Sequence, residues 1–466
     1  MILLIAANLY FQVRMAAVDP IIPTPVRQDL SWSKEARFNR LEIQGAGASW
    51  NPVLRDEFRH FQGATFGSES SALKISFSVR RRQRTDDSFR IDIRPHGVSI
   101  ICDSIASETG RRAIRSALSL LCRLIRVKQG SYSLPTGYVE CIPKIAWRGV
   151  HLFVGPAALA FHKRLWTNVL LPLGYNKAVL QCDLVQWSAL AKSRSKLRMS
   201  THDVAKLCNW YRSVGVEPIP LVQSLGHMDW LLGDARYRRL AVNPSVPYTL
   251  DPRKKGAAEL LGKIWAEVIK VTKAKTIHFG LDEIALRGFP DRLGLATELW
   301  KRQLVSLCAL AKRHNVRMML WGDECLSPGQ APNSTNAPSV QEALERRSYL
   351  PHGALVGDWH YARLTPLEGY IPSLRLFKSE GFQPIACTWY RPENIRTFTL
   401  AAIQEGAGIL QTTWAGYEGS ENVMKANLKQ FSAMVLAADY AWSGRKESPE
   451  NVGYDPSQIF LDWYGR

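Results

Sequence analysis

Long apolar runs, paired cysteines and acidic residues are all scarce in this 466-residue chain. No stretch of about 18 apolar residues occurs, so we expect no membrane-spanning helix. The absence of a Cys-x-x-Cys pair argues against a disulfide framework or a thioredoxin-like motif, and we expect buried free thiols. Cysteine usage of this kind favours a cytoplasmic compartment over secretion, although the compartment stays open. The cysteines are Cys102, Cys122, Cys141, Cys182, Cys208, Cys308, Cys325 and Cys387.

Acidic residues are outnumbered, because 41 Asp and Glu stand against 60 Lys and Arg, which gives a formal net charge of +19. The excess is spread along the chain, and its densest cluster is Arg80, Arg81, Arg82 and Arg84. No nucleic-acid-binding signature accompanies this cluster, so we expect a solvated loop or hairpin and no nucleic-acid partner. An anionic polymer as partner or substrate stays open as the alternative.

The first 19 residues are set apart from the fold. They begin with an apolar run that no basic residues precede, which is an incomplete pattern for a signal peptide. A start at Met15 explains the segment equally well. We therefore treat residues 1–19 as an N-terminal extension that is disordered or foreign to the native chain.

Residues 20–145 have the texture of a small α+β domain. The run from Phe89 to Ile93 alternates with period two, a turn follows at Pro95 to Gly97, and the run from Val98 to Ile101 resumes the pattern. This spacing predicts a β-hairpin. From Glu108 to Val127, apolar residues recur at helical spacing, so we expect a helix across an antiparallel sheet.

From residue 146 to 445 strand-like apolar runs alternate with amphipathic stretches, eight of each. Such a series predicts a closed (β/α)₈ TIM barrel rather than an open doubly wound sheet, whose Gly-rich first turn is missing. Residues 446–466 are expected as a C-terminal tail. The expected strands are 149–154, 178–183, 218–223, 276–282, 317–321, 354–359, 384–389 and 408–414, and the clearest helices are 204–214, 259–271 and 295–314.

Polar and aromatic side chains gather where these strands end, and barrel enzymes place their chemistry at the carboxyl ends of strands. Indole faces stack on sugar rings, and carboxylates bind sugar hydroxyls. Four tryptophans at the same level of successive strands therefore favour a carbohydrate pocket over the alternative that each tryptophan is simply packed in the core. The residues at these ends include Trp321, Trp359, Trp389 and Trp414, together with Asp183, His227, His278, Asp323 and Tyr390.

The fourth strand ends in two adjacent acids, Asp282 and Glu283, after an apolar run. Glycoside hydrolysis needs a proton donor for the leaving oxygen, and Glu283 is the best candidate. Strand seven, where many barrel glycosidases place a nucleophile, ends in Trp389 and Tyr390, with Glu393 three residues further. This favours substrate assistance, in which the sugar's 2-acetamido oxygen attacks the anomeric carbon while Asp282 orients the acetamido N–H.

These residues resemble glycoside hydrolase family 20, the β-N-acetylhexosaminidases, over roughly residues 75–440. The run from His278 to Glu283 is similar to the family's His-x-Gly-Gly-Asp-Glu, with Leu281 in place of the second glycine. The run Leu225-Gly226-His227 is similar to the family's Pro-Gly-His. The resemblance implies an exo-acting, retaining enzyme that removes terminal β-linked N-acetylhexosamine from a glycan, with a small α/β domain before the barrel.

The resemblance also implies roles for single residues. Asp282 and Glu283 would be catalytic, and no metal or cofactor is implied. Three positions depart from the family's pattern, namely Phe153, Pro392 and Gly416, and two of the replaced residues commonly hold outer sugar hydroxyls. The implied substrate-binding residues are Arg148, Asp183, His227, His278, Trp321, Asp323, Trp359, Tyr390 and Trp414.

Three alternatives stay open at this point. The same scaffold can serve as a carbohydrate-binding pseudoenzyme, since a fold does not determine a function. A metal-dependent hydrolase would use His227, His278 and acids, although the usual His-x-His pair is missing from strand one, which carries only His151. An exo-glycosidase for another sugar would not need the acetamido group. The natural glycan and the oligomeric state do not follow from the sequence.

Overall fold

The computed structural model describes residues 20–44, 49–50, 72–79, 87–128, 131–190, 197–362 and 366–465. The N-terminal extension and the arginine cluster at 80–84 lie outside these ranges, so the expectations for them are not addressed. By contacts between Cα atoms the chain divides into two units. The first unit contains the described residues up to Ile142, together with Asn451–Tyr454. The second unit contains the described residues of 143–450 and of 455–465.

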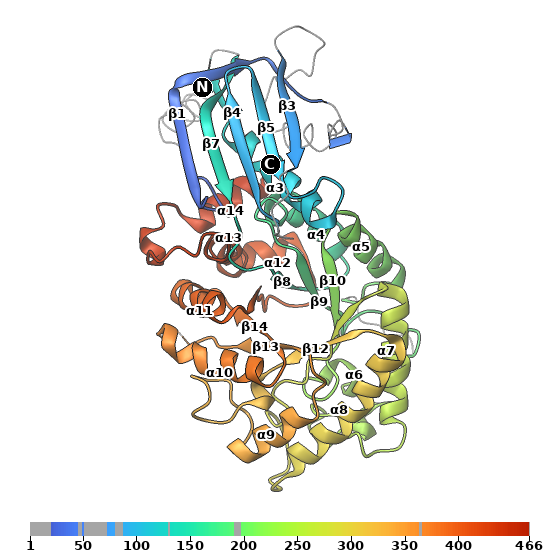
Figure 1. Cartoon of the computed structure of the whole chain (residues 1–466). Coiled ribbons are helices and arrows are strands. Elements are labelled where there is room, and N and C mark those ends of the chain that lie inside the picture. The colour runs from blue at the N-terminus through green and yellow to red at the C-terminus, as the bar shows by residue number, and fades with distance from the viewer. Residues whose placement is uncertain are drawn as a thin grey trace, which may run out of the picture. The chain divides into compact units, whose positions relative to one another are not determined.

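The first unit is an α+β structure. Its sheet has the strand order β1-β7-β4-β5-β3-β2, with β6 paired to β7, and Figure 1 shows β1, β7, β4, β5 and β3 side by side. The predicted hairpin is β4 with β5, and the predicted helix is α3, which contacts both strands. The elements are β1 (Arg27–Phe38), β2 (Arg40–Ile43), β3 (Ala72–Val79), β4 (Phe89–Arg94), β5 (Gly97–Cys102), α3 (Glu108–Arg123), β6 (Arg126–Lys128) and β7 (Ser131–Cys141).

The second unit is built on a closed barrel of parallel strands, in the order β10-β11-β12-β13-β14-β15-β8-β9. The predicted TIM barrel is confirmed, and each of the eight expected strands is present within a few residues of its expected ends. The strands are β8 (Arg148–Phe153), β9 (Lys177–Gln181), β10 (Glu217–Leu221), β11 (Thr276–His278), β12 (Arg317–Trp321), β13 (Leu355–Trp359), β14 (Gln383–Thr388) and β15 (Gly408–Gln411).

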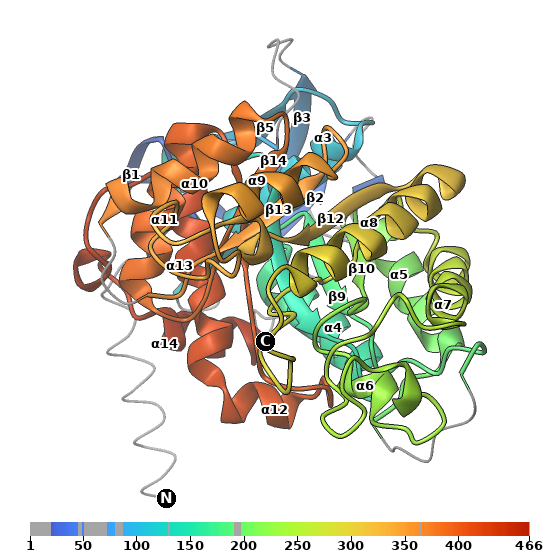
Figure 2. The same ribbon diagram turned by 90° about the horizontal axis from the view of Figure 1, so that it is seen from below.

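Helices surround this barrel, as Figure 2 shows for α5, α7, α8, α10, α11 and α13. The segment 446–466 is more than a tail, because residues 456–464 form α14, which contacts α13. The helices are α4 (Ala158–Leu165), α5 (Thr201–Ser213), α6 (Asp229–Leu232), α7 (Ala257–Thr272), α8 (Leu295–His314), α9 (Val340–Ser348), α10 (Leu367–Ser379), α11 (Pro392–Glu405), α12 (Glu421–Ala426), α13 (Leu428–Ser443) and α14 (Pro456–Tyr464).

The barrel interior is an apolar core rather than a channel. Side chains from six strands form one buried cluster, which includes Val179, Ile219, Met319, Leu355 and Leu410. This filling supports the strand ends from below, so side chains at those ends can be held in fixed positions. All eight cysteines are free, and all but the half-buried Cys308 are buried, as expected. Among the described helices, none has the length and apolarity that crossing a bilayer requires.

Candidate active site

The loop after β11 carries the two adjacent acids and depends on left-handed backbone. Gly280 has a φ of 71°, and a Cβ there would lie 1.8 Å from Oε1 of Gln223, so only glycine fits. Leu281 and Glu283 are also left-handed, with φ of 75° and 47°. This conformation costs a residue with a side chain roughly 1–2 kcal/mol, so other contacts must hold the loop.

Two neighbouring carboxylates after β12 supply those contacts. Oδ2 of Asp323 accepts a hydrogen bond from the backbone N–H of Glu283 at 2.9 Å. Oε1 of Glu324 accepts one from the backbone N–H of Ile284, also at 2.9 Å. Successive amides of one loop are therefore held by successive carboxylates of the next strand end, and together they fix the direction of the Glu283 side chain.

Both carboxylates are themselves fixed. Asp323 also accepts hydrogen bonds from Nδ2 of Asn336 at 2.7 Å and from Nε1 of Trp359 at 3.0 Å. Glu324 forms a buried ion pair with Arg346. Burial raises the pKa of Asp323 well above its ordinary value, with the charges of Glu324 and Asp282 adding to the effect. Asp323 was expected to bind sugar, but it is 1% exposed, and its carboxylate holds the protein's own groups.

The loop that contains Asn336 contributes to the site. Asn336 binds Asp323, and Oδ1 of Asn333 lies 3.0 Å from Nδ1 of His360. His360 follows β13 and pairs in turn with Asp358, whose carboxylate oxygen lies 2.8 Å from Nε2. This loop ends where helix α9 begins, at Val340.

His227 joins the two acids of the β11 loop. Its Nε2 lies 3.1 Å from Oε2 of Glu283 and 3.4 Å from Oδ2 of Asp282. Burial lowers the pKa of His227, but the charges and hydrogen bonds of both acids outweigh this effect and raise the pKa to about 10. Burial would also raise the pKa of Asp282, yet His227 and a hydrogen bond from Gln223 hold that pKa below its ordinary value. The Glu283 side chain is 29% exposed, so solvent or a ligand can reach it.

Gln223, which the sequence analysis did not single out, links Asp282 to the strand before it. Its Nε2 donates to Oδ1 of Asp282 at 2.8 Å, and its Oε1 accepts from the backbone N–H of Leu281 at 3.2 Å. Its own backbone N–H donates to Oδ1 of Asp183 at 2.8 Å. Its position two residues beyond the end of β10 was the available signal, because that is the level at which barrel side chains enter the site.

Asp183 is completely buried beneath the acids. Its Oδ2 accepts hydrogen bonds from Nε2 of Gln181 and from the Tyr417 hydroxyl, each at 2.8 Å. Burial raises the pKa of Asp183 to about 6 against these hydrogen bonds. With both oxygens occupied by the protein, Asp183 supports the site from below and is not exposed for the sugar contact that the resemblance implied.

Aromatic rings gather at the ends of β13, β14 and β15 and form a group that we call the aromatic wall. The ring of Tyr361 lies 5.2 Å from that of Trp359 and 5.5 Å from that of Trp389. Nε1 of Trp414 donates to the Tyr361 hydroxyl at 3.2 Å. Trp321 lies 6.0 Å from Trp414 and packs in the core cluster, so it forms the floor. The expected tryptophans of strands five, six, seven and eight therefore share one aromatic group, in which Tyr361 was not foreseen.

Two buried histidines lie beneath this wall. His151 contacts the Trp414 ring at 4.6 Å, and its ring nitrogens lie 2.8 Å from the carbonyl oxygen of Thr413 and from Oε1 of Gln181. His278 contacts the Trp321 ring at 4.4 Å. Burial lowers the pKa of His151 to about 4 and that of His278 to about 3, so both are neutral at pH 7. His278 therefore supports the floor rather than carrying charge to a ligand.

Of two further expected sugar-binding residues, one reaches the aromatic group and the other does not. Arg148 begins β8, at the amino end of the barrel, roughly 16 Å along the strand from its other end. Its guanidinium donates to the carbonyl oxygens of Gly174 and Ile145 and lies 4.8 Å from the Trp442 ring, so it is already satisfied. Direct sugar binding by Arg148 does not fit this position. Tyr390 contacts the aromatic group, with its ring 4.3 Å from that of Trp389, and also lines a cavity of about 780 Å³ beside α11 and α13.

The departures from the family's pattern also have structural counterparts. Phe153 lies at the end of β8 with its ring 4.8 Å from that of Tyr417 and 6.2 Å from that of Trp414. Gly416 has a φ of 98°, and a Cβ there would meet no atom within 4 Å. Pro392 is the first residue of α11. Phe153 therefore brings an aromatic ring close to Trp414, and Gly416 leaves free space beside its own backbone.

One set of described residues has the ligand types and spacing of a metal site, namely His227, Asp282 and Glu283, whose ligand atoms lie within 4.8 Å of one another. A metal-dependent hydrolase would also use His278, which does not belong to this set of residues. A protonated His227 balances one of the two carboxylate charges, so its ion pairs account for the close approach of these three side chains.

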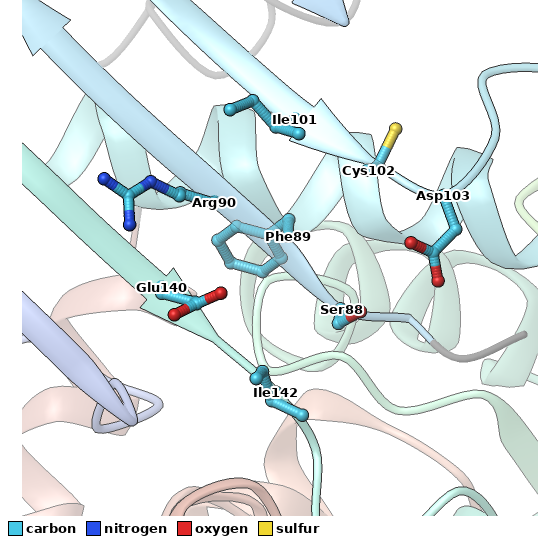
Figure 3. A pocket seen from close by; sticks show the side chains of 8 residues that line it. All are labelled: Ser88, Phe89, Arg90, Ile101, Cys102, Asp103, Glu140 and Ile142. Atoms are coloured by element: carbon cyan, nitrogen blue, oxygen red, sulfur yellow. The ribbon is translucent and has the colours of Figure 1, made fainter. Parts of the chain in front are cut away.

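A second pocket lies in the first unit, at the ends of β4, β5 and β7 (Figure 3). Its lining includes Phe89, Cys102, Asp103 and Glu140, and its volume is about 20 Å³. That space suits a single water molecule, not a sugar. The chemistry of the described residues is therefore concentrated at the carboxyl ends of the barrel strands.

Comparison with known proteins supports the fold. No protein-family profile matches the chain. Human hexosaminidase D is 26% identical over 145 residues, which span 28% of this chain and 29% of that protein. The family 20 β-N-acetylhexosaminidase of Streptomyces coelicolor has a TM-score of 0.68 at 16% identity, with 97% of each chain covered. The family 20 exo-β-N-acetylglucosaminidase of Vibrio harveyi, solved with N-acetylglucosamine, has a TM-score of 0.66 at 14% identity, covering 97% of this chain and 78% of that one. Along nearly its whole length, the chain has the fold of the glycoside hydrolase family 20 β-N-acetylhexosaminidases.

Proposed function

We propose that this protein is an exo-acting glycoside hydrolase that removes terminal β-linked N-acetylhexosamine by a retaining, substrate-assisted mechanism. The observation that carries the proposal is the cluster of Asp282, Glu283 and His227, found together with the aromatic wall at the carboxyl ends of the barrel strands. The shared fold and the local likeness to human hexosaminidase D support the same activity.

In the first step Glu283 protonates the glycosidic oxygen as the bond to the anomeric carbon breaks. The acetamido carbonyl oxygen of the same sugar attacks that carbon and forms a cyclic oxazolinium intermediate. Oδ2 of Asp282 accepts the acetamido N–H, which carries positive charge in this intermediate. In the second step Glu283 takes a proton from water, the water oxygen bonds to the anomeric carbon, and the ring opens with the β configuration retained.

His227 supplies the proton that this scheme requires at Glu283. Because Nε2 of His227 lies 3.1 Å from Oε2 of Glu283 and carries a proton at neutral pH, the proton can pass between them as the leaving oxygen becomes basic. The pair can regain its proton when water attacks. Asp282 stays ionised at neutral pH, since its pKa is held low, and that suits its role toward the acetamido group.

The aromatic wall would hold the sugar ring by its apolar face. Trp359, Trp389 and Trp414 are only half-buried, so their rings are accessible to a ligand, whereas Trp321 is 1% exposed. A pyranose stacks on such faces and presents its hydroxyls at the rim. Exchange of Trp414 for Ala is therefore expected to raise KM more than it lowers kcat.

The test compares Glu283→Gln with the matched control Glu393→Gln on two aryl β-N-acetylhexosaminides. Without the acid, hydrolysis of a poor leaving group such as a methoxyphenol should fall about 10²- to 10⁴-fold, while a dinitrophenol, which needs little protonation, should lose far less. Glu393→Gln should match the wild type, because substrate assistance needs no nucleophile after strand β14. Equal losses for both leaving groups, or inactivation by Glu393→Gln alone, would contradict the proposal.

A further inference from the structure

Arg287 differs in its contacts from other arginines in the loops after β10 and β11. Among the described residues, Arg292 pairs with Glu298, and Arg253 pairs with Asp251. Arg287 is exposed, and within the described ranges its guanidinium makes neither a hydrogen bond nor an ion pair. It lies instead over the ring of Tyr248, 5.2 Å from the centroid. A positive charge is thus held in place without an anionic partner.

The segment that carries Arg287 is fixed on both sides. The hydroxyl of Thr249 donates to the carbonyl oxygen of Ile284, and Nδ2 of Asn243 donates to that of Gly288 at 3.0 Å. Gly288 has a φ of 58°, and a Cβ there would lie 2.4 Å from Cβ of Val246, so the loop lies directly against its neighbour. The position of Arg287 is therefore set by the two loops together.

Tyr248 connects this arginine to the catalytic cluster. Its ring lies 5.1 Å from that of His227, which contacts Glu283. Tyr248 is 1% exposed, and its hydroxyl has no hydrogen-bond partner among the described residues. Because a buried hydroxyl without a partner is costly, this atom is suited to a group that arrives with a ligand.

The location of the pair determines which part of a substrate would reach it. The aromatic wall comes from the ends of β13, β14 and β15 and would hold the sugar that is released. Tyr248 and Arg287 come from the loops after β10 and β11, on the side of Glu283, the proposed donor to the leaving oxygen. Groups beyond the proton donor contact the leaving group, not the released sugar.

We propose that Tyr248 and Arg287 form a binding site for a leaving-group sugar that carries an anionic substituent, a carboxylate or a sulfate. The proposal rests on the proposed glycosidase function and names its substrate class. A guanidinium binds the two oxygens of such groups with parallel hydrogen bonds, and its stacking on Tyr248 leaves its N–H edge free. The Tyr248 hydroxyl would bond to a ring substituent of the same sugar. The net charge of +19 favours approach of a polyanionic glycan.

The experiment measures kcat/KM for three disaccharides, in which N-acetylglucosamine is β-linked to glucose, to glucuronic acid or to glucose 6-sulfate. The wild type is expected to prefer one or both anionic disaccharides over the neutral one by about five- to tenfold at low salt, with the preference falling at high salt. Whichever anionic disaccharide is preferred shows whether the site binds a carboxylate or a sulfate.

Variants assign the preference to these residues. Arg287→Gln should remove it while leaving hydrolysis of the neutral disaccharide and of an aryl N-acetylglucosaminide unchanged. The matched control, Arg292→Gln, lies on the same loop and should keep it. Tyr248→Phe should raise KM for every disaccharide but not for the aryl substrate. Equal rates on all three disaccharides in the wild type, or a preference that survives Arg287→Gln, would overturn the proposal. Failure to cleave any substrate, aryl compounds included, would instead count against the glycosidase function.

Discussion

Oδ2 of Asp323 accepts the backbone N–H of Glu283 at 2.9 Å, so the proposed proton donor is aimed by a carboxylate that it does not contact with its own side chain. Exchange of Asp323 for Ala should leave that amide, and Nε1 of Trp359, without their acceptor. We expect unfolding free energy to fall by about 1–3 kcal/mol and kcat to fall more than KM changes. Urea denaturation and steady-state kinetics measure the two effects.

A milder variant separates the positioning of the Glu283 side chain from the stability of the fold. Asn336→Ala removes one donor to Asp323 but leaves the contact with Glu283 in place. Stability should drop by about 1 kcal/mol while kcat stays within a few-fold of the wild type. If Asn336→Ala reduced kcat as strongly as Asp323→Ala, the loss would be due to a general loosening of the loop and not to the aim of Glu283.

The pairing of His227 with the two acids predicts a dependence of stability on pH. Its pKa is about 10 in the folded state and about 6.5 when the chain is unfolded. The folded state therefore binds the proton more tightly, and the stabilisation is complete below pH 6.5 and is lost as the pH rises through about 10. The difference in unfolding free energy between the wild type and His227→Gln should shrink over this range. A difference that stays constant from pH 6.5 to 10 would contradict the pairing.

Leu281 tests how the loop is held. Leu281→Gly removes a left-handed strain of roughly 1–2 kcal/mol, but it also removes a completely buried side chain worth about 2–5 kcal/mol. Because the loss of burial outweighs the relief of strain, the variant should be less stable than the wild type, with a lower Tm. A variant of higher Tm would show that strain, not packing, dominates at this position.

The cluster of His227, Asp282 and Glu283 also has the spacing of a metal site, so chelation is informative. We expect hydrolysis of an aryl N-acetylhexosaminide to be unchanged after exhaustive treatment with EDTA and removal of the chelator. Activity that disappeared and returned with a single divalent cation would mean that these side chains bind a metal, and the acid–base roles would then need revision.

Much of this architecture could be predicted from the sequence, and the limits have physical causes. The eight strands of the barrel were recognisable because each is a short apolar run followed by a helix with one apolar face. The acids Asp282 and Glu283 were recognisable because a carboxylate pair directly after a buried strand has few explanations. For Arg148 the motif match did not reveal that backbone carbonyls of Gly174 and Ile145 hold its guanidinium at the amino end of the strand.

Other site residues depend on the paths of loops. Tyr361, from beyond β13, joins the aromatic wall with its ring 5.5 Å from that of Trp389. The expected Tyr390 lies 4.3 Å from the same ring and also lines the cavity beside α11 and α13. Gln223 and Tyr248 reach the acids from the loop after β10, and no spacing in the sequence relates them to residues more than 30 positions further on. Tertiary arrangement, not local pattern, decides these contacts.

The central claim is that the substrate's own acetamido group completes the catalytic machinery. Its most direct test is the ratio of kcat/KM for an aryl 2-acetamido-2-deoxy-β-glucoside to that for the matching aryl β-glucoside. Participation of the acetamido oxygen predicts a ratio of about 10³ or more in the wild type and a much smaller one in Asp282→Asn, where the acetamido N–H loses its charged acceptor. Comparable rates on both glycosides in the wild type would contradict the account.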